Sequence, residues 1–457
     1  MGTVFIGAGA GFASDRTDAA TPVVAALARC DGPRFLIFET LAERTLAQAQ
    51  VERRQDPARG YNPALESFVA PVLRECLDSR IRIVSNFGAA NPRAAGERIL
   101  AMAEDLGCRP PRIAIVEGDD LTGVLAPDEF GRREVGGALL REAPPVVAAN
   151  AYIGAAPIAE ALEQGADIVV TGRVADPSLV LGPLIHAFRW PLDDWDRLAA
   201  GTLVGHLLEC GSQVTGGYFA DPGVKDVPGM DELGYPIAEV EEGGAFVITK
   251  PAGTGGLVDR RTVTEQILYE IHDPSAYLTP DVVLDVTEVE LAEIGPDRVR
   301  VTGARGKPKT ATLKATVCID GGLLGEAEIS YAGPNAAARA RLAVETVKAR
   351  MARRAPGLQV RADAIGLVSV LGNSAGEQLE SRWTAGELED VRVRFAAQSF
   401  DAGELELLLG EVEALYCAGP AGGAGVRRRL TPRLASASCL VERELVRPTV
   451  SFLGGGQ

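Results

Sequence analysis

The chain has 457 residues, of which 46% are hydrophobic and 24% charged, so it is long enough for two or three domains and too apolar to be intrinsically disordered. No uncharged apolar run approaches the roughly 20 residues that cross a bilayer, which excludes a membrane-spanning protein. The 46 basic and 62 acidic residues give a net charge of −16, and a field of that sign repels the phosphates of nucleic acids.

From the first residue to about residue 190, short β-branched runs alternate with stretches of helical period rich in Ala, Leu, Arg and Glu. Uninterrupted apolar runs indicate strands that are covered on both faces, and helices between them indicate parallel crossovers. The sequence therefore predicts an α/β fold with a parallel sheet and helices on both faces. The predicted strands cover residues 3–6, 35–38, 81–84, 113–116, 146–149 and 168–170.

The first strand leads into a glycine-rich segment, GAGAGFASDR. A dinucleotide-binding turn would need glycine at Phe12 and an acidic residue about 20 positions on, whereas Glu39 lies farther away. We therefore expect the amides around Gly9 and Gly11, with Asp15 and Arg16 beside them, to bind a phosphate or carboxylate. A nucleotide-dependent oxidoreductase remains an alternative on this turn alone.

Polar or charged residues follow each predicted strand. Ligands of open α/β sheets bind at the carboxyl ends of the strands, so these residues are expected to share one site. The alternative is that they cap the following helices, but Glu39, Glu117 and Arg173 are poor caps, so the joint pattern favours a site. The residues at the strand ends are Glu39, Asn86, Glu117, Asp119, Asp120, Asn150, Thr171 and Arg173.

Carboxylates are the main candidates for chemistry. Crowding at Glu117 and Asp119 could raise the pKa of one carboxyl group and make it an acid or base. Alternatively, Asp119 and Asp120 could bind a divalent metal through their oxygens. Asp176, three residues after Arg173, is placed to orient that arginine. The predicted catalytic residues are Glu39, Glu117, Asp119, Arg173 and Asp176.

After residue 191, shorter segments alternate apolar and polar residues between glycine turns, which predicts an α+β part with a largely antiparallel sheet. Helices are expected at 195–210, 264–271, 335–354 and 404–416. The predicted domains are residues 1–190, residues 191–355, and a C-terminal α/β extension at 356–457 that packs on the first two.

Two loops of the second half are candidate phosphate sites. One has exposed amides beside a lysine; its predicted binding residues are Lys250, Gly253, Thr254, Gly255 and Gly256. The other is the basic segment 305–309. Together they would suit the nucleotide end of coenzyme A, and the alternative is that they are solvated turn charges.

On the predicted helix 195–210, His206 shares a face with Glu209 and Cys210. This spacing suits a metal site or a Cys–His pair, and also ordinary packing of a buried helix. The seven cysteines are scattered, odd in number and without a CxxC pair, which favours reduced thiols. The N-terminus lacks the basic region of a signal peptide, so we expect a cytoplasmic protein.

Long segments resemble the acyclic terpene utilisation (AtuA-type) family; they include FETLAERTLA, SNFGAANPRAA, DIVVTGRVADPSL, GHLLECGSQVTGGYFADPG and EIHDPSAYLTPDVV. The resemblance runs in order from residue 7 to about 330. It implies a bacterial protein that acts alongside acyl-CoA catabolism, such as the degradation of citronellol- or geraniol-derived acids.

The leading hypothesis is a lyase or hydratase that moves a proton next to the carbonyl of an acyl-CoA or small carboxylic acid. The carboxylates would act as acid and base, and Asn86, Asn150 and Arg173 would bind the carbonyl or carboxylate. No motif identifies a cofactor; the residues suggest a coenzyme A moiety on the substrate and leave a divalent metal open. The alternative is a non-catalytic subunit of a complex with other catabolic proteins, and a homodimer is expected in either case.

Overall fold

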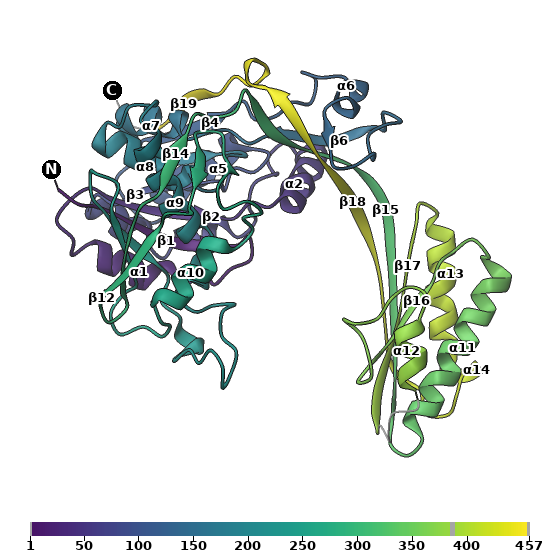
Figure 1. Cartoon of the computed structure of the whole chain (residues 1–457). Helices are drawn as coiled ribbons and strands as arrows, with labels where there is room; N and C mark the ends of the chain where they lie inside the picture. Colours follow the sequence, from purple (N-terminus) through teal and green to yellow (C-terminus); the bar gives the residue numbers. More distant parts are fainter. Residues whose placement is uncertain (1, 384–388, 455–457) are drawn as a thin grey trace. The chain divides into compact units, whose positions relative to one another are not determined.

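The structure, a computed structural model, describes residues 2–383 and 389–454 and divides into two units (Figure 1). Unit 1 contains the chain up to Cys318 and again from Ser436, and unit 2 is Ile319–Ala435. The boundaries expected near residues 190 and 355 do not coincide with this division. The reason is that strands from residues 237–302 join the same sheet as the N-terminal strands.

The centre of unit 1 is a parallel sheet in the order β1-β2-β3-β7-β4. Successive residues of its strands, such as Leu36 and Ile37, are both fully buried, so both faces of the sheet are covered. The predicted α/β class is therefore confirmed. The strands are β1 (Val4–Gly11), β2 (Arg34–Glu39), β3 (Arg82–Ser85), β4 (Ile113–Glu117) and β7 (Ile168–Thr171).

Helices cover the two faces of this sheet. On one face, α1, α3, α4 and α5 share an apolar cluster with alternate strand residues. The strands β4, β2 and β1 also contact α7, α8 and α9 respectively. These helices are α1 (Ala20–Leu27), α3 (Leu65–Val69), α4 (Leu73–Asp78), α5 (Pro92–Asp105), α7 (Ala156–Glu163), α8 (Ser178–Phe188) and α9 (Trp195–Glu209).

The antiparallel strands predicted after residue 191 extend the same sheet. β8 pairs with β1, and β9, β13 and β12 follow outward, while β19 pairs with β4 at the other end (Figure 1). Among the described residues, the sheet therefore has ten strands. The added strands are β8 (Ile237–Val240), β9 (Phe246–Thr249), β12 (Glu290–Gly295), β13 (Arg298–Thr302) and β19 (Thr449–Leu453).

One predicted strand does not belong to the parallel sheet. β6 (Val146–Ala151) pairs with β15 instead. The outer side of β4 is occupied by β19, so β6 has no free edge there. The remaining elements of unit 1 are α2 (Glu43–Gln55), α6 (Pro127–Gly131), α10 (Arg260–Leu268), β5 (Glu134–Val135), β10 (Tyr277–Leu278), β11 (Val283–Asp285), β14 (Arg305–Lys307) and the 3₁₀ turns Gly211–Thr215, Met230–Glu232 and Arg443–Leu445.

Unit 2 has a second core and the βαββαβ order of ferredoxin-like domains. Its sheet runs β16-β17-β15-β18, and α11 and α13 contact both β17 and each other (Figure 1). β15 continues through Gly321 and Gly322, where glycine accommodates the positive φ of +75° at Gly322. The elements are β15 (Thr312–Ala332), α11 (Ala336–Arg354), β16 (Arg361–Ile365), α12 (Glu377–Arg382), β17 (Asp390–Ser399), α13 (Ala402–Glu413), α14 (Leu415–Ala418) and β18 (Ala424–Glu442).

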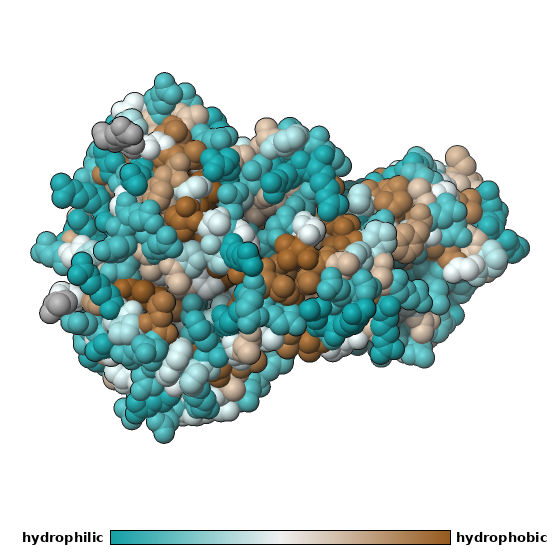
Figure 2. Space-filling model, turned by 90° about the horizontal axis from the view of Figure 1, so that it is seen from above, coloured by the Kyte–Doolittle hydropathy of each residue, from teal (hydrophilic) through white to brown (hydrophobic). Residues whose placement is uncertain are grey.

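The surface mixes polar and apolar side chains. Figure 2 shows apolar patches bordered by hydrophilic residues on one face of the molecule. Among the described residues, no helix combines the length and the apolar character needed to cross a membrane.

Candidate functional site

A cavity of about 1100 Å³ lies in unit 1 at the carboxyl ends of three parallel strands. Gly11 ends β1, Glu39 ends β2, and Arg173 follows β7; all three residues line the cavity. Other parts of its wall come from the end of α9 and from residues 310–314 and 438–440. The cavity therefore occupies the edge of the sheet at which the strand-end pattern predicts a site.

Glu39 is a buried carboxyl group on the cavity wall, 9% exposed. Its Oε1 accepts hydrogen bonds from the backbone N–H of Leu41 and from Nδ2 of Asn86, both at 2.8 Å. Burial raises the pKa of Glu39 to about 7, against the lowering effect of Arg173 and of these hydrogen bonds. Glu39 can therefore hold or release a proton near neutral pH.

The asparagines at the strand ends do not cap helices. The Oδ1 of Asn86 accepts the backbone N–H of Thr40 at 2.8 Å, which orients its Nδ2 towards Glu39. Asn150 donates to Asp119 Oδ2 at 2.8 Å. In both cases an amide from one strand end holds a carboxylate from another, which the helix-cap alternative did not predict.

Arg173 lies between these groups and is 1% exposed. Its guanidinium donates to the carbonyl of Val174 at 2.8 Å, to the carbonyl of Leu41 and to Asp176. The guanidinium also stacks 4.5 Å from the centre of the Tyr152 ring. The structure thus brings Arg173 and Asp176 together as predicted, but the guanidinium is engaged by the protein itself.

Asp119 lies behind Arg173 and is not among the described residues that line the cavity. Its Oδ2 accepts the backbone N–H of Arg173 at 3.0 Å in addition to Asn150. Burial raises the pKa of Asp119 to about 6, against these two hydrogen bonds. Gly172 is required beside it, because a Cβ there would lie 2.6 Å from Asp119 Oδ1.

A second ion pair stands on the cavity wall and was not predicted. Glu43, at the start of α2, accepts a hydrogen bond from the Tyr152 hydroxyl and lies 3.2 Å from Nζ of Lys314. Burial opposes ionisation, but the Tyr152 hydrogen bond and the charge of Lys314 hold the pKa of Glu43 at about 2. Glu43 is therefore ionised and paired at neutral pH.

The predicted His206–Glu209–Cys210 face reaches the cavity through its last two residues. Nδ1 of His206 lies 3.0 Å from Oε1 of Glu209, and the buried Oε2 of Glu209 has no hydrogen-bond partner among the described atoms. Burial opposes protonation of His206, but its bond to Glu209 outweighs this and raises the pKa of His206. Burial raises the pKa of the Cys210 thiol, so a thiolate nucleophile is not favoured there.

The end of α9 reaches this position because β1 ends in glycine. A Cβ on Gly11 would lie 2.1 Å from the backbone nitrogen of Gly211 and 2.2 Å from the carbonyl carbon of Cys210. Gly9 is likewise covered, by the ring of Phe38. The amide of Gly11 is taken by Asp15 at 2.9 Å. The glycines thus belong to a packed strand, and the turn that would support a dinucleotide is not formed.

Several residues predicted to bind substrate or to act in catalysis are engaged elsewhere. Arg16 donates to the carbonyls of Asp231 and Met230, both at 3.0 Å. Thr171 is buried and donates to the carbonyl of Gly172. Glu117 pairs with Thr449 of β19 at the edge of β4 and is not among the described residues of the cavity lining.

The two predicted phosphate loops are also engaged. Lys250 is buried, donates to the carbonyl of Thr254 at 2.9 Å and lies 3.3 Å from Asp297. The amides of Gly255 and Gly256 donate to the carbonyls of Glu232 and Pro228, and Gly253 lies in the same loop outside the described cavity lining. In the basic segment, Arg305 pairs with Asp196 and Glu288, and Lys307 with Asp285.

The alternative that Asp119 and Asp120 bind a divalent metal finds no set of ligands among the described residues. Asp120 accepts hydrogen bonds from Thr122 and lies 3.4 Å from Nε2 of Gln50. In the part of the chain that the structure describes, no three His, Cys, Asp or Glu side chains lie close enough to bind one ion.

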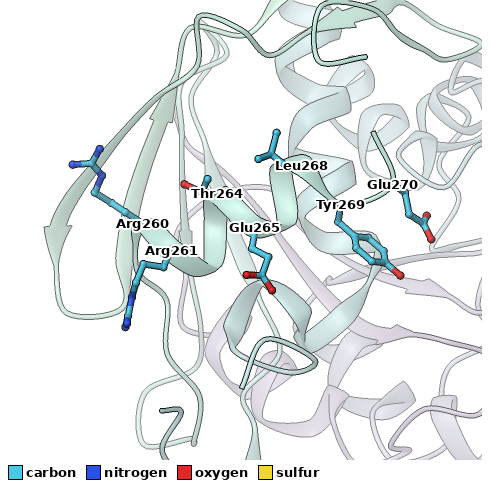
Figure 3. Close-up of a pocket in the computed structure, with 7 residues that line it drawn as sticks. All are labelled: Arg260, Arg261, Thr264, Glu265, Leu268, Tyr269 and Glu270. Atoms are coloured by element: carbon cyan, nitrogen blue, oxygen red, sulfur yellow. The ribbon is translucent and has the colours of Figure 1, made fainter. Parts of the chain in front are cut away.

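A second hollow of about 760 Å³ lies along α10. In Figure 3, Arg260 and Arg261 lie at one end of the helix and Tyr269 and Glu270 at the other, so the labelled side chains do not converge on one point. Since ligand sites need converging polar groups, the cavity at the strand ends is the candidate active site.

The comparisons with known proteins identify a family. The model described as acyclic terpene utilisation family protein AtuA matches residues 4–452, which is nearly the whole chain. No curated protein and no solved structure matched the chain.

Proposed function

Because the chain belongs to the acyclic terpene utilisation family, and so has a role in the use of acyclic terpenes, we propose that its cavity is the active site of a lyase or hydratase. The substrate is an acyl-CoA thioester or carboxylic acid derived from an acyclic terpene. The reaction moves a proton next to the carbonyl group. Such chemistry requires a proton donor and a proton acceptor held in one site.

The observation that supports this proposal most directly is the raised pKa of the Glu39 carboxyl group on the cavity wall. A carboxyl group whose pKa is about 7 is well matched to proton transfer at neutral pH, and Glu39 lines the cavity. Asn86 and the Leu41 amide fix its orientation. Glu39 is therefore assigned as the general acid, and Glu209, which lines the same cavity and whose charge acts on Glu39, as the base.

The other predicted residues have supporting roles in this proposal. Arg173 holds Asp176 and the Leu41 carbonyl in place and contributes positive charge to the site. Asp119, with Asn150, fixes the backbone of Arg173. These are positioning residues, since their polar atoms are bonded to the protein.

Only the acyl end of a coenzyme A thioester is placed in the cavity. The basic groups of the Lys250 loop and of Arg305 are paired with acids of the same chain, which leaves them little capacity for phosphate. The nucleotide end would remain outside, in solvent.

The test is proton exchange in D₂O with the coenzyme A thioesters of citronellic and geranic acids, followed by mass spectrometry. Wild-type protein should incorporate deuterium next to the carbonyl, and Glu39→Gln should slow this by about 100-fold or more, as for loss of a general acid. Glu117→Gln is the matched control, because Glu117 also ends a parallel strand. Exchange by Glu39→Gln at the wild-type rate would refute the assignment.

A binding subunit is the second possibility and gives a different result. In that case wild-type protein would bind the thioesters without exchange, and it would co-purify with another acyl-CoA-degrading subunit from its host.

A further inference from the structure

The charges on the cavity wall are unevenly paired. Its cations Arg173 and Lys314 already face acids of the same wall, Asp176 and Glu43. The donors of Arg173 are further occupied by the carbonyls of Val174 and Leu41. Apart from the exposed His272, the described lining offers no basic side chain without an acidic partner.

Carboxylates outnumber these cations. The lining contains six acidic residues, Asp15, Glu39, Glu43, Asp176, Glu209 and Glu270. Glu209 is 7% exposed; its Oε1 is bonded to Nδ1 of His206 at 3.0 Å, and its buried Oε2 has no hydrogen-bond partner among the described atoms. A buried acceptor of this kind favours a ligand that donates a hydrogen bond or carries no charge, because an anion beside it is repelled in a low-dielectric site.

The outer part of the same cavity is apolar. Five large hydrophobic side chains that line it are exposed to solvent: Phe12, Val135, Tyr218, Leu278 and Leu440. Tyr218 is 84% exposed and Leu278 62%. A hydrocarbon chain that covers such surface is removed from water together with it, which favours binding.

From this combination we infer that the cavity binds an apolar acyl chain whose reacting group is an uncharged thioester or ester carbonyl, and that it rejects the free carboxylate. The inference rests on the proposed function for the identity of the acyl chain. Of the two substrates proposed there, the thioester and the free acid, it selects the thioester. The acyl chain lies along the apolar wall, and the neutral carbonyl lies among the carboxyl groups.

Calorimetric titration of the full-length protein tests this with two probes at about pH 8, where the free acid is ionised. The probes are citronellic acid and its N-acetylcysteamine thioester, which share one acyl chain. The thioester should bind at least about tenfold more tightly than the acid, as expected for one uncompensated charge contact.

Two variants show whether the wall charges cause the preference. Glu209→Gln removes a negative charge and Glu43→Gln releases Lys314, so each should strengthen binding of the acid by about fivefold. Glu43→Gln, which is not at the proposed base, should also change thioester binding by less than about twofold. Glu43 is partly exposed, so that variant should fold even if Glu209→Gln does not. Glu117→Gln is the control and should leave both affinities unchanged.

Equal or tighter binding of the acid, an unaltered preference in both variants, or no binding of either probe would overturn the inference. These outcomes are separate from failure of the proposed function, which is read from deuterium exchange. A thioester preference without exchange leaves the inference standing, whereas exchange that depends on Glu39 together with a preference for the acid overturns the inference alone.

Discussion

Glu39 keeps its proton to a pH near 7 because its carboxyl group is removed from water, and Arg173 compensates only part of that loss. In an unfolded chain the same group ionises near pH 4.3. Between these two values the folded state holds a proton that the unfolded state has released. The free energy of unfolding therefore falls as the pH rises through this window, by about 3–4 kcal/mol.

Glu39→Gln should remove this contribution, since the amide carbonyl can accept the same two hydrogen bonds without a charge. We expect the variant to be more stable than wild type at pH 8 and close to it at pH 5, although it is catalytically impaired. Urea denaturation at both pH values measures this. If the difference in free energy of unfolding between the variant and wild type were the same at pH 5 and pH 8, Glu39 would have an ordinary pKa and the assignment would be wrong.

The site was predicted in part from the sequence. Strand-end polarity placed Glu39, Asn86 and Arg173 at one edge, because parallel strands bring their carboxyl ends together. Asn150 reaches Asp119 from β6, outside that sheet, and Asp176 was predicted from its spacing to Arg173. Strand-end polarity did not identify the Glu43–Lys314 pair, since Lys314 comes from β15 and no local pattern relates it to residue 43. Glu209 carried a usable signal, the i,i+3 spacing from His206, but this spacing also occurs in buried helices.

At the level of elements, the contact between β1 and the end of α9 depends on Gly11, which has a hydrogen atom where any other residue would have a Cβ. Gly11→Ala should destabilise the protein by about 1–3 kcal/mol and displace Glu209 and Cys210, because the added methyl group meets backbone atoms that cannot rotate away. Proton exchange should fall together with stability. Chemical denaturation and the exchange assay check the two effects.

Gly410→Ala is the matched control. Gly410 lies inside α13, and a Cβ there meets no atom within 4 Å. Alanine should stabilise the helix by up to about 1 kcal/mol and leave exchange unchanged. If Gly11→Ala behaved like Gly410→Ala, the close approach of the two backbones would not matter.

Strands and helices with strong periodicity were predicted to within a few residues, such as α9 and α11. Pairing partners were harder to predict. β6 has the apolar composition of a parallel strand, but β19, more than 290 residues later, occupies the edge that it would need. The glycine turns expected between the segments of the second half are not all turns, since Gly321 and Gly322 lie within β15.

On the scale of the whole molecule, the chain has separate hydrophobic cores in unit 1 and unit 2. Phe395 is fully buried in the unit 2 core and Phe68 in the unit 1 core. Phe395→Ala should lower the stability of unit 2 by about 3–5 kcal/mol and leave thioester affinity unchanged, whereas Phe68→Ala should reduce both the stability of unit 1 and the affinity.

Scanning calorimetry and titration with the thioester distinguish these effects. Two thermal transitions are expected, each moved by the substitution in its own core. A single transition that both substitutions shift equally would show that the units unfold as one.

The cavity wall joins residues from both ends of unit 1, from Gly11 near the start of the chain to Leu440 near its end. A ribosome releases the amino-terminal part first, and the nascent chain must wait for its last segments before the pocket can close. During that interval the buried apolar side chains of the wall, such as Leu41, lack their final surroundings. Synthesis of this protein should therefore depend on chaperones that shield exposed hydrophobic surface until translation is nearly finished.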